Sequence, residues 1–167
     1  MTKFIALLTI FALLGTSALA SDLKVGAAGA FDDEILTLEA MLQYALEDER
    51  LALAEYEAII DTFGVTSPFT NIIKAEATHE AALLNLYDMK GIAAPKLDTT
   101  KYIVLPDTLE EIYEIGIEAE INNIAMYEKF LEQNLDDEVI DVFLVLKEAS
   151  KKHLEAFQRS STGSSQG

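Results

Sequence analysis

A glutamate and a histidine stand in the apolar face of a helix predicted over residues 67–90. Glu76 and His79 fall in register with Phe69, Ile72 and Leu83, at the steps of three and four that define one face of a helix. An ionisable group in an apolar seam is costly unless a partner compensates it. Glu-x-x-His on the inner face of a helical bundle supplies such a partner when both side chains point at one metal ion.

Three more ionisable residues occupy apolar positions of predicted helices. Glu49 lies in a helix predicted over residues 32–63, Glu120 in one over 107–134, and His153 in one that begins at 136. Carboxylate oxygens and neutral imidazole nitrogens suit iron and manganese, and two ions can share a bridging carboxylate. The sequence therefore predicts a metal site. The alternative from the residues alone is a set of hydrogen-bonded pairs in an ordinary core. The candidate ligands are Glu49, Glu76, His79, Glu120 and His153.

An internal repeat relates the two halves of the chain. The first and third predicted helices align without a gap, and the second and fourth align more weakly. The matched pairs include Glu49 with Glu120, Tyr56 with Tyr127, and His79 with His153. Residues 92–106 carry two prolines and a β-branched stretch, which predicts an extended connection. Two helical hairpins joined in this way predict an all-α four-helix bundle with a crossover between its second and third helices.

The first twenty residues have the pattern of a signal peptide. Lys3 precedes an apolar run over residues 4–14, and Ala18-Leu19-Ala20 before Ser21 forms an Ala-x-Ala cleavage site. An uncleaved N-terminal anchor is the alternative. We expect an exported mature protein, periplasmic or extracellular and without stable membrane insertion. Its parts are a flexible lead-in over 21–31, the bundle over 32–159 and a disordered tail over 160–167.

Composition narrows the classes of partner. The 167 residues include no cysteine, so disulfides and cysteine-ligated zinc or iron–sulfur sites are excluded. The formal net charge of −17 disfavours binding to nucleic acid and to anionic lipid, and it favours cations. Most of these acidic residues are interpreted as a solubilising surface, and metal ions are the expected partners because of the glutamate and histidine pattern. A homodimer is compatible with the sequence, which does not determine the oligomeric state.

Four stretches carry a family pattern. They are residues 46–52 with Tyr56, 69–72 with 75–79, 116–120 with 122–124, and 149–154 with 156–157. The pattern resembles the ferritin-like di-iron carboxylate superfamily, to which rubrerythrin belongs. It is most similar to the exported, rubrerythrin-related ferritin-like domain family of unknown function. The resemblance extends over about residues 36–159.

The resemblance implies a role for each candidate ligand. Glu49 and Glu120 would each contribute a single carboxylate, and Glu76 would bridge two iron ions. His79 and His153 would each bind one ion. Manganese and zinc are the alternative metals.

Two positions depart from the superfamily pattern. Ser150 stands where a glutamate is expected, three residues before the second histidine, and Asn123 stands where rubrerythrin-like sites have another carboxylate. Three carboxylates do not neutralise two divalent ions, so we expect a second ion that is weaker, exchangeable or completed by water. Tyr56 and Tyr127 are expected either to hydrogen-bond ligand carboxylates or to pack in the core. Asp48 is interpreted as a charge on the outer face.

The leading functional hypothesis is a di-iron oxidoreductase that acts on Fe(II) with peroxide or dioxygen, of the ferroxidase or peroxide-scavenging type. The redox step comes from the resemblance alone. Rubrerythrins add a cysteine-ligated iron domain that supplies electrons. This chain has no cysteine, so a partner or Fe(II) itself must supply them. The alternatives are a non-enzymatic protein that binds one or two metal ions, and a structural or partner-binding bundle without metal.

Overall fold

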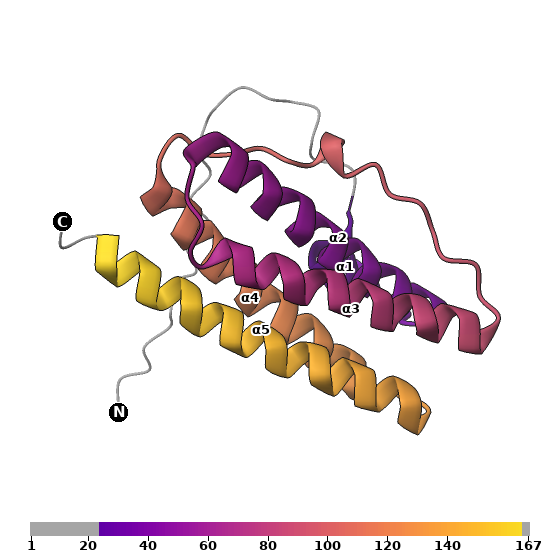
Figure 1. Cartoon of the computed structure of the whole chain (residues 1–167). Coiled ribbons are helices and arrows are strands. Elements are labelled where there is room, and N and C mark those ends of the chain that lie inside the picture. The colour runs from indigo at the N-terminus through magenta and orange to yellow at the C-terminus, as the bar shows by residue number, and fades with distance from the viewer. Residues whose placement is uncertain (1–23, 165–167) are drawn as a thin grey trace, which may run out of the picture.

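The computed structural model describes residues 24–164, and all regular structure in that range is helical. The predicted all-α fold class is therefore confirmed (Figure 1). The elements are α1 (Gly26–Asp32), α2 (Leu38–Phe63), α3 (Phe69–Lys90), the 3₁₀ turn η1 (Thr99–Lys101), α4 (Leu109–Leu131) and α5 (Asp137–Ser164). No helix among these residues is both long enough and apolar enough to span a bilayer.

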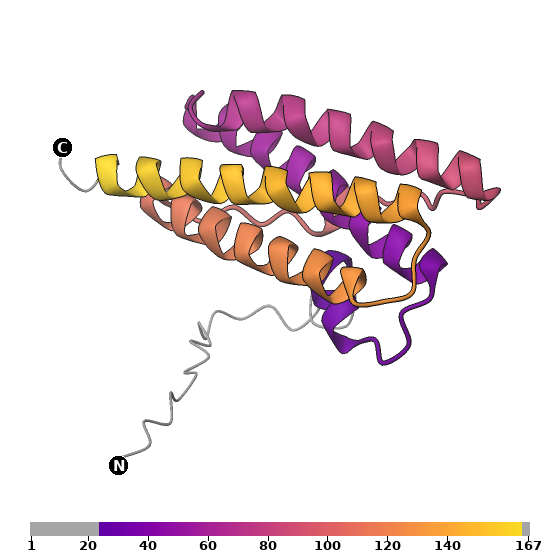
Figure 2. The ribbon, with the colours of Figure 1, turned by 90° about the horizontal axis from the view of Figure 1, so that it is seen from below.

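The four long helices lie side by side (Figures 1 and 2). Short loops join α2 to α3 and α4 to α5, and the helices of each pair pack together. The two pairs meet through contacts of α3 with α5 and of α2 with α4. Residues 92–108 return along α2 from the end of α3 to the start of α4 (Figure 1). Arg50 holds this segment, because its Nη1 donates to the Pro95 carbonyl at 2.7 Å.

The ends of α2 and α4 follow ordinary capping chemistry. The Thr37 hydroxyl accepts from the Ala40 amide at 3.1 Å, and the Thr108 hydroxyl accepts from the Glu111 amide at 3.3 Å. Side-chain oxygens at these positions satisfy amides of the first turn, which have no partner inside the helix. Gly64 ends α2 with φ of 68°, a left-handed conformation that glycine adopts without steric cost.

Two apolar clusters form the core, one toward each end of the bundle. One contains Leu42, Leu83, Tyr127 and Phe143, among others, and the second is built around Tyr56, Phe69 and Phe157. Gly116 allows a close approach in the second cluster, because a Cβ there would lie 3.0 Å from the Phe157 ring. The candidate ligands belong to neither cluster, although they are buried.

The segment predicted to be a flexible lead-in contains α1, so this part of the prediction is corrected for residues 24–31. The amide of Gly26 donates to Glu47 Oε2 at 3.1 Å, and the amide of Ala27 donates to Asp48 Oδ1 at 2.9 Å. Lys129 Nζ donates to the Ala30 carbonyl at 2.6 Å. These contacts attach α1 to α2 and α4 (Figure 2).

Two helix boundaries also differ from the prediction. The predicted first long helix begins at Leu38, not at residue 32, because α1 and a turn occupy the preceding residues. The last helix continues to Ser164, five residues beyond the predicted end of the bundle at 159. The predicted signal peptide, residues 1–20, and the last three residues of the predicted tail lie outside the described residues.

Candidate metal centre

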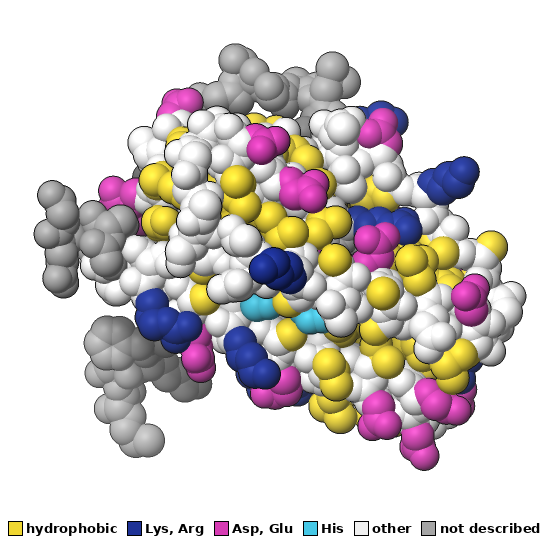
Figure 3. All heavy atoms as spheres, in the orientation of Figure 1, with side chains coloured by type: hydrophobic (Ala, Val, Ile, Leu, Met, Phe, Trp, Pro, Cys, Tyr) yellow, Lys and Arg dark blue, Asp and Glu magenta, His cyan; other side chains and the backbone are white. Residues whose placement is uncertain are grey.

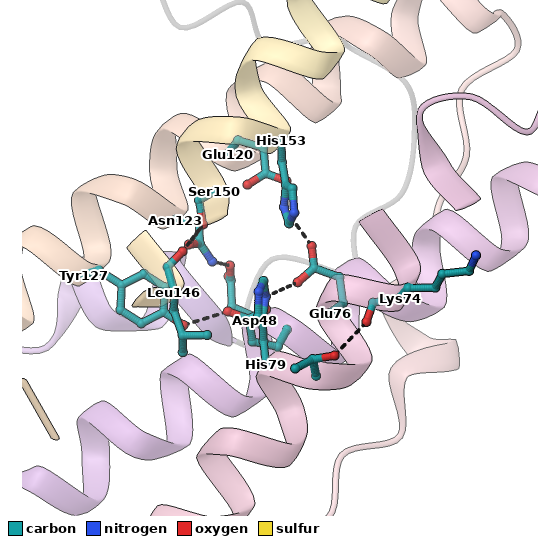
Figure 4. Close-up of polar contacts among 12 residues, drawn as sticks. Asp48, Lys74, Glu76, His79, Glu120, Asn123, Tyr127, Leu146, Ser150 and His153 are labelled. Atoms are coloured by element: carbon teal, nitrogen blue, oxygen red, sulfur yellow. Dashed lines mark hydrogen bonds and ion pairs between the residues drawn. The ribbon is translucent and has the colours of Figure 1, made fainter. Parts of the chain in front are cut away.

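The fold brings the five candidate ligands together in the middle of the bundle. Glu49 comes from α2, Glu76 and His79 from α3, Glu120 from α4 and His153 from α5. All five side chains are buried, and none is more than 8% exposed. Figure 4 shows that four of them, Glu76, His79, Glu120 and His153, face a common centre. The five side chains form two groups that share Glu76. Within each group the ligand atoms lie within 4.8 Å of one another.

The first group is Glu49, Glu76 and His79. His79 Nδ1 lies 3.0 Å from Glu49 Oε2 and 2.9 Å from Glu76 Oε2. A ring nitrogen carries at most one hydrogen, so it can donate to only one of these two oxygens at a time. Two carboxylates that converge on one imidazole nitrogen are an arrangement that a cation would complete.

The second group is Glu76, Glu120 and His153. His153 Nδ1 lies 3.1 Å from Glu76 Oε1 and 3.5 Å from Glu120 Oε1. Although it is close to both oxygens, this buried nitrogen has no hydrogen-bond partner. A buried polar atom without a partner requires an explanation, and a metal ion between the three groups provides one. The unpartnered Nδ1 of His153 is therefore evidence that these donor groups fit a metal ion.

Glu76 belongs to both groups. Its Oε2 faces His79 and its Oε1 faces His153, and the two imidazole rings lie 5.8 Å apart between centroids. A carboxylate whose two oxygens face two separate sites can bridge two metal ions. The cluster could thus hold one ion in either group or one in each.

The two tyrosines of the repeat make crossed hydrogen bonds. Tyr127 Oη donates to Glu49 Oε1 at 2.7 Å, and Tyr56 Oη donates to Glu120 Oε1 at 3.1 Å. Each tyrosine therefore supports the carboxylate of the opposite half of the repeat. Burial is the main cause of raised pKa values for both phenols, and the neighbouring carboxylates raise them further. The phenols consequently remain donors, which orients the carboxylates.

Ser150 and Asn123, the positions that depart from the superfamily pattern, hydrogen-bond each other. Ser150 Oγ donates to Asn123 Oδ1 at 2.6 Å, and Asn123 Nδ2 donates to Asp48 Oδ2 at 2.5 Å (Figure 4). The other oxygen of Asp48 accepts from the Ala27 amide of α1. A continuous hydrogen-bonded chain thus connects Ser150 of α5 to α1 through Asn123 and Asp48.

The assignment of Asp48 to the outer face was wrong. A helix-period pattern marks one buried stripe on α2, and Asp48 lies beside that stripe. Because α1 packs against α2, it covers a second stripe that includes Glu47 and Asp48. The repeat contains a weak indication of this difference, since Glu49 aligns with Glu120 but Asp48 aligns with Ala119.

A cavity of about 20 Å³ lies next to the candidate ligands. This volume is enough for one water molecule, and the polar lining offers it hydrogen-bond partners. Ser150, which the repeat aligns with Glu76 of the first half, contributes to the wall of this cavity. The lining residues are Asp48, Glu49, Ala52, Tyr56, Glu76, Ala119, Glu120, Asn123 and Ser150.

The buried charges shift one another's proton affinity. Burial and then the charge of Glu76 raise the pKa of Glu49. Burial alone would raise the pKa of Glu76, but its close contacts with Glu49 and the two histidines outweigh burial and lower it. Burial alone would also lower the histidine pKa values, yet the carboxylates that lie close to each ring raise the pKa of His79 to about 10 and that of His153 to about 9. Without metal, protonated imidazoles therefore balance the carboxylates, and a divalent ion would replace those protons.

The fold and the site define an all-helical protein with a buried glutamate–histidine cluster that could hold a metal ion. The chain belongs to the family described as an uncharacterized protein domain, DUF2202, whose model matches residues 38–165. The match includes the five candidate ligands and leaves out α1.

Comparison with solved structures supports the fold. The chain is similar to the crystal structure of hypothetical protein MJ0754 from Methanococcus jannaschii DSM 2661, with a TM-score of 0.70 and 21% sequence identity. The similarity covers 80% of this chain and 85% of that chain. At this identity the likeness shows a shared fold. It does not show whether the two proteins share an activity. No curated protein matches the chain.

Proposed function

We propose that this chain is an exported, ferritin-like four-helix bundle protein that holds two iron ions. It acts on Fe(II) with peroxide or dioxygen, as a ferroxidase or a peroxide scavenger does. The observation that carries the proposal is Glu76, because its two oxygens face the histidines of different halves of the repeat. The long return of residues 92–108 along α2 supports the crossover of a ferritin-like bundle (Figure 1).

In this proposal the residues hold, orient and shield the ions. Glu49 and Glu120 would each serve one ion, oriented by the crossed tyrosines, and the apolar clusters on either side exclude bulk water. Bound iron would supply one-electron chemistry, two Fe(II) ions together giving the two electrons that, with two protons, reduce one peroxide to two waters. The cavity beside Ser150, which has room for one water molecule, lies where a small oxidant would approach the ions.

The proposed export depends on residues 1–20. A charged start, an apolar run and an Ala-x-Ala site form the pattern of a cleaved signal peptide. Determining the N-terminal residue of the protein expressed with its own leader tests this part, and Ser21 is the expected first residue. A chain that retains residue 1 and stays in the membrane fraction would contradict it.

The metal and its chemistry are tested by measuring the metal content of protein purified without chelators, followed by consumption of peroxide upon addition of Fe(II). We expect close to two irons per chain and a rate of consumption that depends on them. Glu76→Gln should reduce the content to less than one ion, since the bridging carboxylate is lost. Glu57→Gln, the same change on the exposed face of α2, is the control and should change neither quantity. Full metal content in Glu76→Gln would refute the shared site.

Ser150 favours a second candidate function, non-enzymatic metal binding. With three carboxylates the site does not neutralise two divalent ions, and the hydrogen bond from Ser150 to Asn123 leaves no further anionic ligand at that position. One bound ion, or zinc or manganese without oxidant consumption, would support this candidate. Absence of metal after reconstitution would support the third alternative, a structural or partner-binding bundle.

A further inference from the structure

A surface pocket of about 500 Å³ lies between the start of α3 and the second half of α5. This volume is within the range of small-molecule sites. We call it the His153 pocket, because His153 forms part of its wall. Its lining residues are Ser67, Pro68, Asn71, Ile72, Lys152, His153, Ala156, Arg159 and Ser160.

The His153 pocket is cationic in a strongly acidic protein. The chain has 29 acidic residues and 12 lysines and arginines, yet no carboxylate is among the described residues that line this pocket. Lys152 forms no ion pair within residues 24–164. Among the described residues the Arg159 guanidinium forms an ion pair only with Glu155, at 3.5 Å, and both side chains are about two-thirds exposed. Such a contact is weak, so both cations are available to a ligand.

His153 connects the pocket to the candidate metal centre. Its Nδ1 is buried against Glu76 and Glu120. The part of the ring that borders the pocket is therefore the opposite edge, which carries Nε2. Figure 3 shows histidine side chains reaching the surface with basic side chains nearby. Nε2 of His153 forms no hydrogen bond with any described residue.

The Nε2 atom of His153 indicates which chemical group a ligand of the pocket would carry, namely a hydrogen-bond acceptor. A metal-bound histidine almost always donates its other ring N–H to a carboxylate, a carbonyl or a water, which orients the ring and strengthens the metal bond. Because the described residues supply no acceptor to His153 Nε2, a water or a ligand in the pocket would be its acceptor. An oxyanion would accept this hydrogen and would also pair with Lys152 and Arg159.

We propose that the His153 pocket binds a small oxyanionic molecule, a carboxylate or a phosphate, through Lys152, Arg159 and the Nε2–H of His153. The binding to Lys152 and Arg159 does not depend on metal. The coupling to the metal centre rests on the proposed function: an anion that orients His153 tightens the metal, and by reciprocity the metal tightens the anion.

Isothermal titration with two probes, inorganic phosphate and succinate, tests the proposal at constant ionic strength. Each probe is titrated into the metal-free protein and into protein loaded with Mn(II), an air-stable ion of the same charge as Fe(II). The double variant Lys152→Gln/Arg159→Gln removes both cations. Lys151→Gln is the matched control. Lys151 directly precedes Lys152 in α5, pairs with Glu148 and lies outside the pocket lining.

We expect one probe molecule to bind per metal-free chain, about tenfold more weakly in the double variant and unchanged in Lys151→Gln. The stronger probe identifies the ligand as a phosphate or a carboxylate. Loading with Mn(II) should tighten binding in the unmodified protein. The pocket proposal is overturned if neither probe binds, if Lys151→Gln weakens binding as much as the double variant does, or if the double variant binds normally.

The metal-loaded titration separates the two proposals. Equal anion affinity with and without bound Mn(II) overturns the coupling while leaving the metal site intact. A chain that binds no metal refutes the proposed function, and the metal-free titration still decides whether the pocket binds anions. Circular dichroism of each variant verifies that these exposed substitutions leave the helical fold unchanged.

Discussion

Replacing two buried tyrosines with phenylalanine should have opposite effects on stability. Tyr127 and Tyr87 are both almost completely buried, and each substitution removes one oxygen atom. The hydroxyl of Tyr127 donates to Glu49 at 2.7 Å, whereas the hydroxyl of Tyr87 has no hydrogen-bond partner among the described residues. The two substitutions therefore isolate one hydrogen bond from the general effect of removing a hydroxyl.

The expected magnitudes follow from these partners. In the metal-free protein the raised pKa of Glu49 favours its neutral form, so Tyr127→Phe should cost about 1 kcal/mol, the value of an ordinary hydrogen bond. Tyr87→Phe removes an unsatisfied polar atom and should stabilise by about 1 kcal/mol. At roughly 2–4 °C per kcal/mol for a chain of this size, the two melting temperatures should differ by about 4–8 °C.

Metal should increase the cost of losing the Tyr127 hydroxyl. A ligating Glu49 is ionised, and a hydrogen bond to an ionised group contributes about 1.5–3 kcal/mol. The difference from the metal-free value, about 0.5–2 kcal/mol, corresponds to roughly two- to thirtyfold weaker metal binding in Tyr127→Phe. Tyr87→Phe should bind metal normally.

Thermal and urea unfolding of both variants, with and without metal, measure these quantities, and a competition titration against a metal-binding dye gives the affinity. Equal destabilisation by the two substitutions would refute the reasoning from hydrogen-bond partners. Unchanged metal affinity in Tyr127→Phe would show that Glu49 is not a ligand, whatever the effect on stability.

Three further predictions concern the charges and the ions of the site. His79 and His153 have folded pKa values of about 10 and 9, above the unfolded value of about 6.5. Their stabilisation is complete below pH 6.5 and lost as the pH rises through 9–10, so urea unfolding should show metal-free protein less stable at pH 10 than at pH 7. A flat profile would contradict these shifts. Asp48→Ala should cost about 2 kcal/mol and speed hydrogen exchange at the Ala27 amide, because both acceptor oxygens are lost. Asp61→Ala, an exposed control, should do neither, and unchanged exchange in Asp48→Ala would contradict the docking of α1. Metal at 100 times its dissociation constant should stabilise the protein by about 2.7 kcal/mol. Adding a chelator should lower the melting temperature accordingly, and an unchanged value would contradict specific binding to the folded state.

Much of the fold was predictable because the helices are long and strongly periodic. Ionisable residues in apolar stripes, such as Glu49 and His153, stand out against that periodicity, and the repeat relates them to Glu120 and His79. Helix ends were less predictable. Asp32 and Asp33 suit a first helical turn, but Thr37 caps α2 instead, because α1 and its turn occupy the preceding residues.

The part of the site beyond the five candidate ligands was not predictable from periodicity. A helix pattern shows which stripe is buried by the bundle, and it contains no information about α1, a seven-residue helix rich in glycine and alanine. Since α1 contributes amides as well as apolar contacts, it covers the carboxylates of Glu47 and Asp48, which the sequence suggests are exposed.

The sequence by itself determined the all-helical class and the candidate ligand types, because both follow from residue identity and spacing along one helix. Only the tertiary structure decided which partners meet between helices. It joined Tyr127 to Glu49 and Tyr56 to Glu120, and it left the hydroxyl of Tyr87 without a partner. The physical reason is that the spacing within a helix determines the direction of a side chain. What that side chain meets depends on how the neighbouring helices are packed.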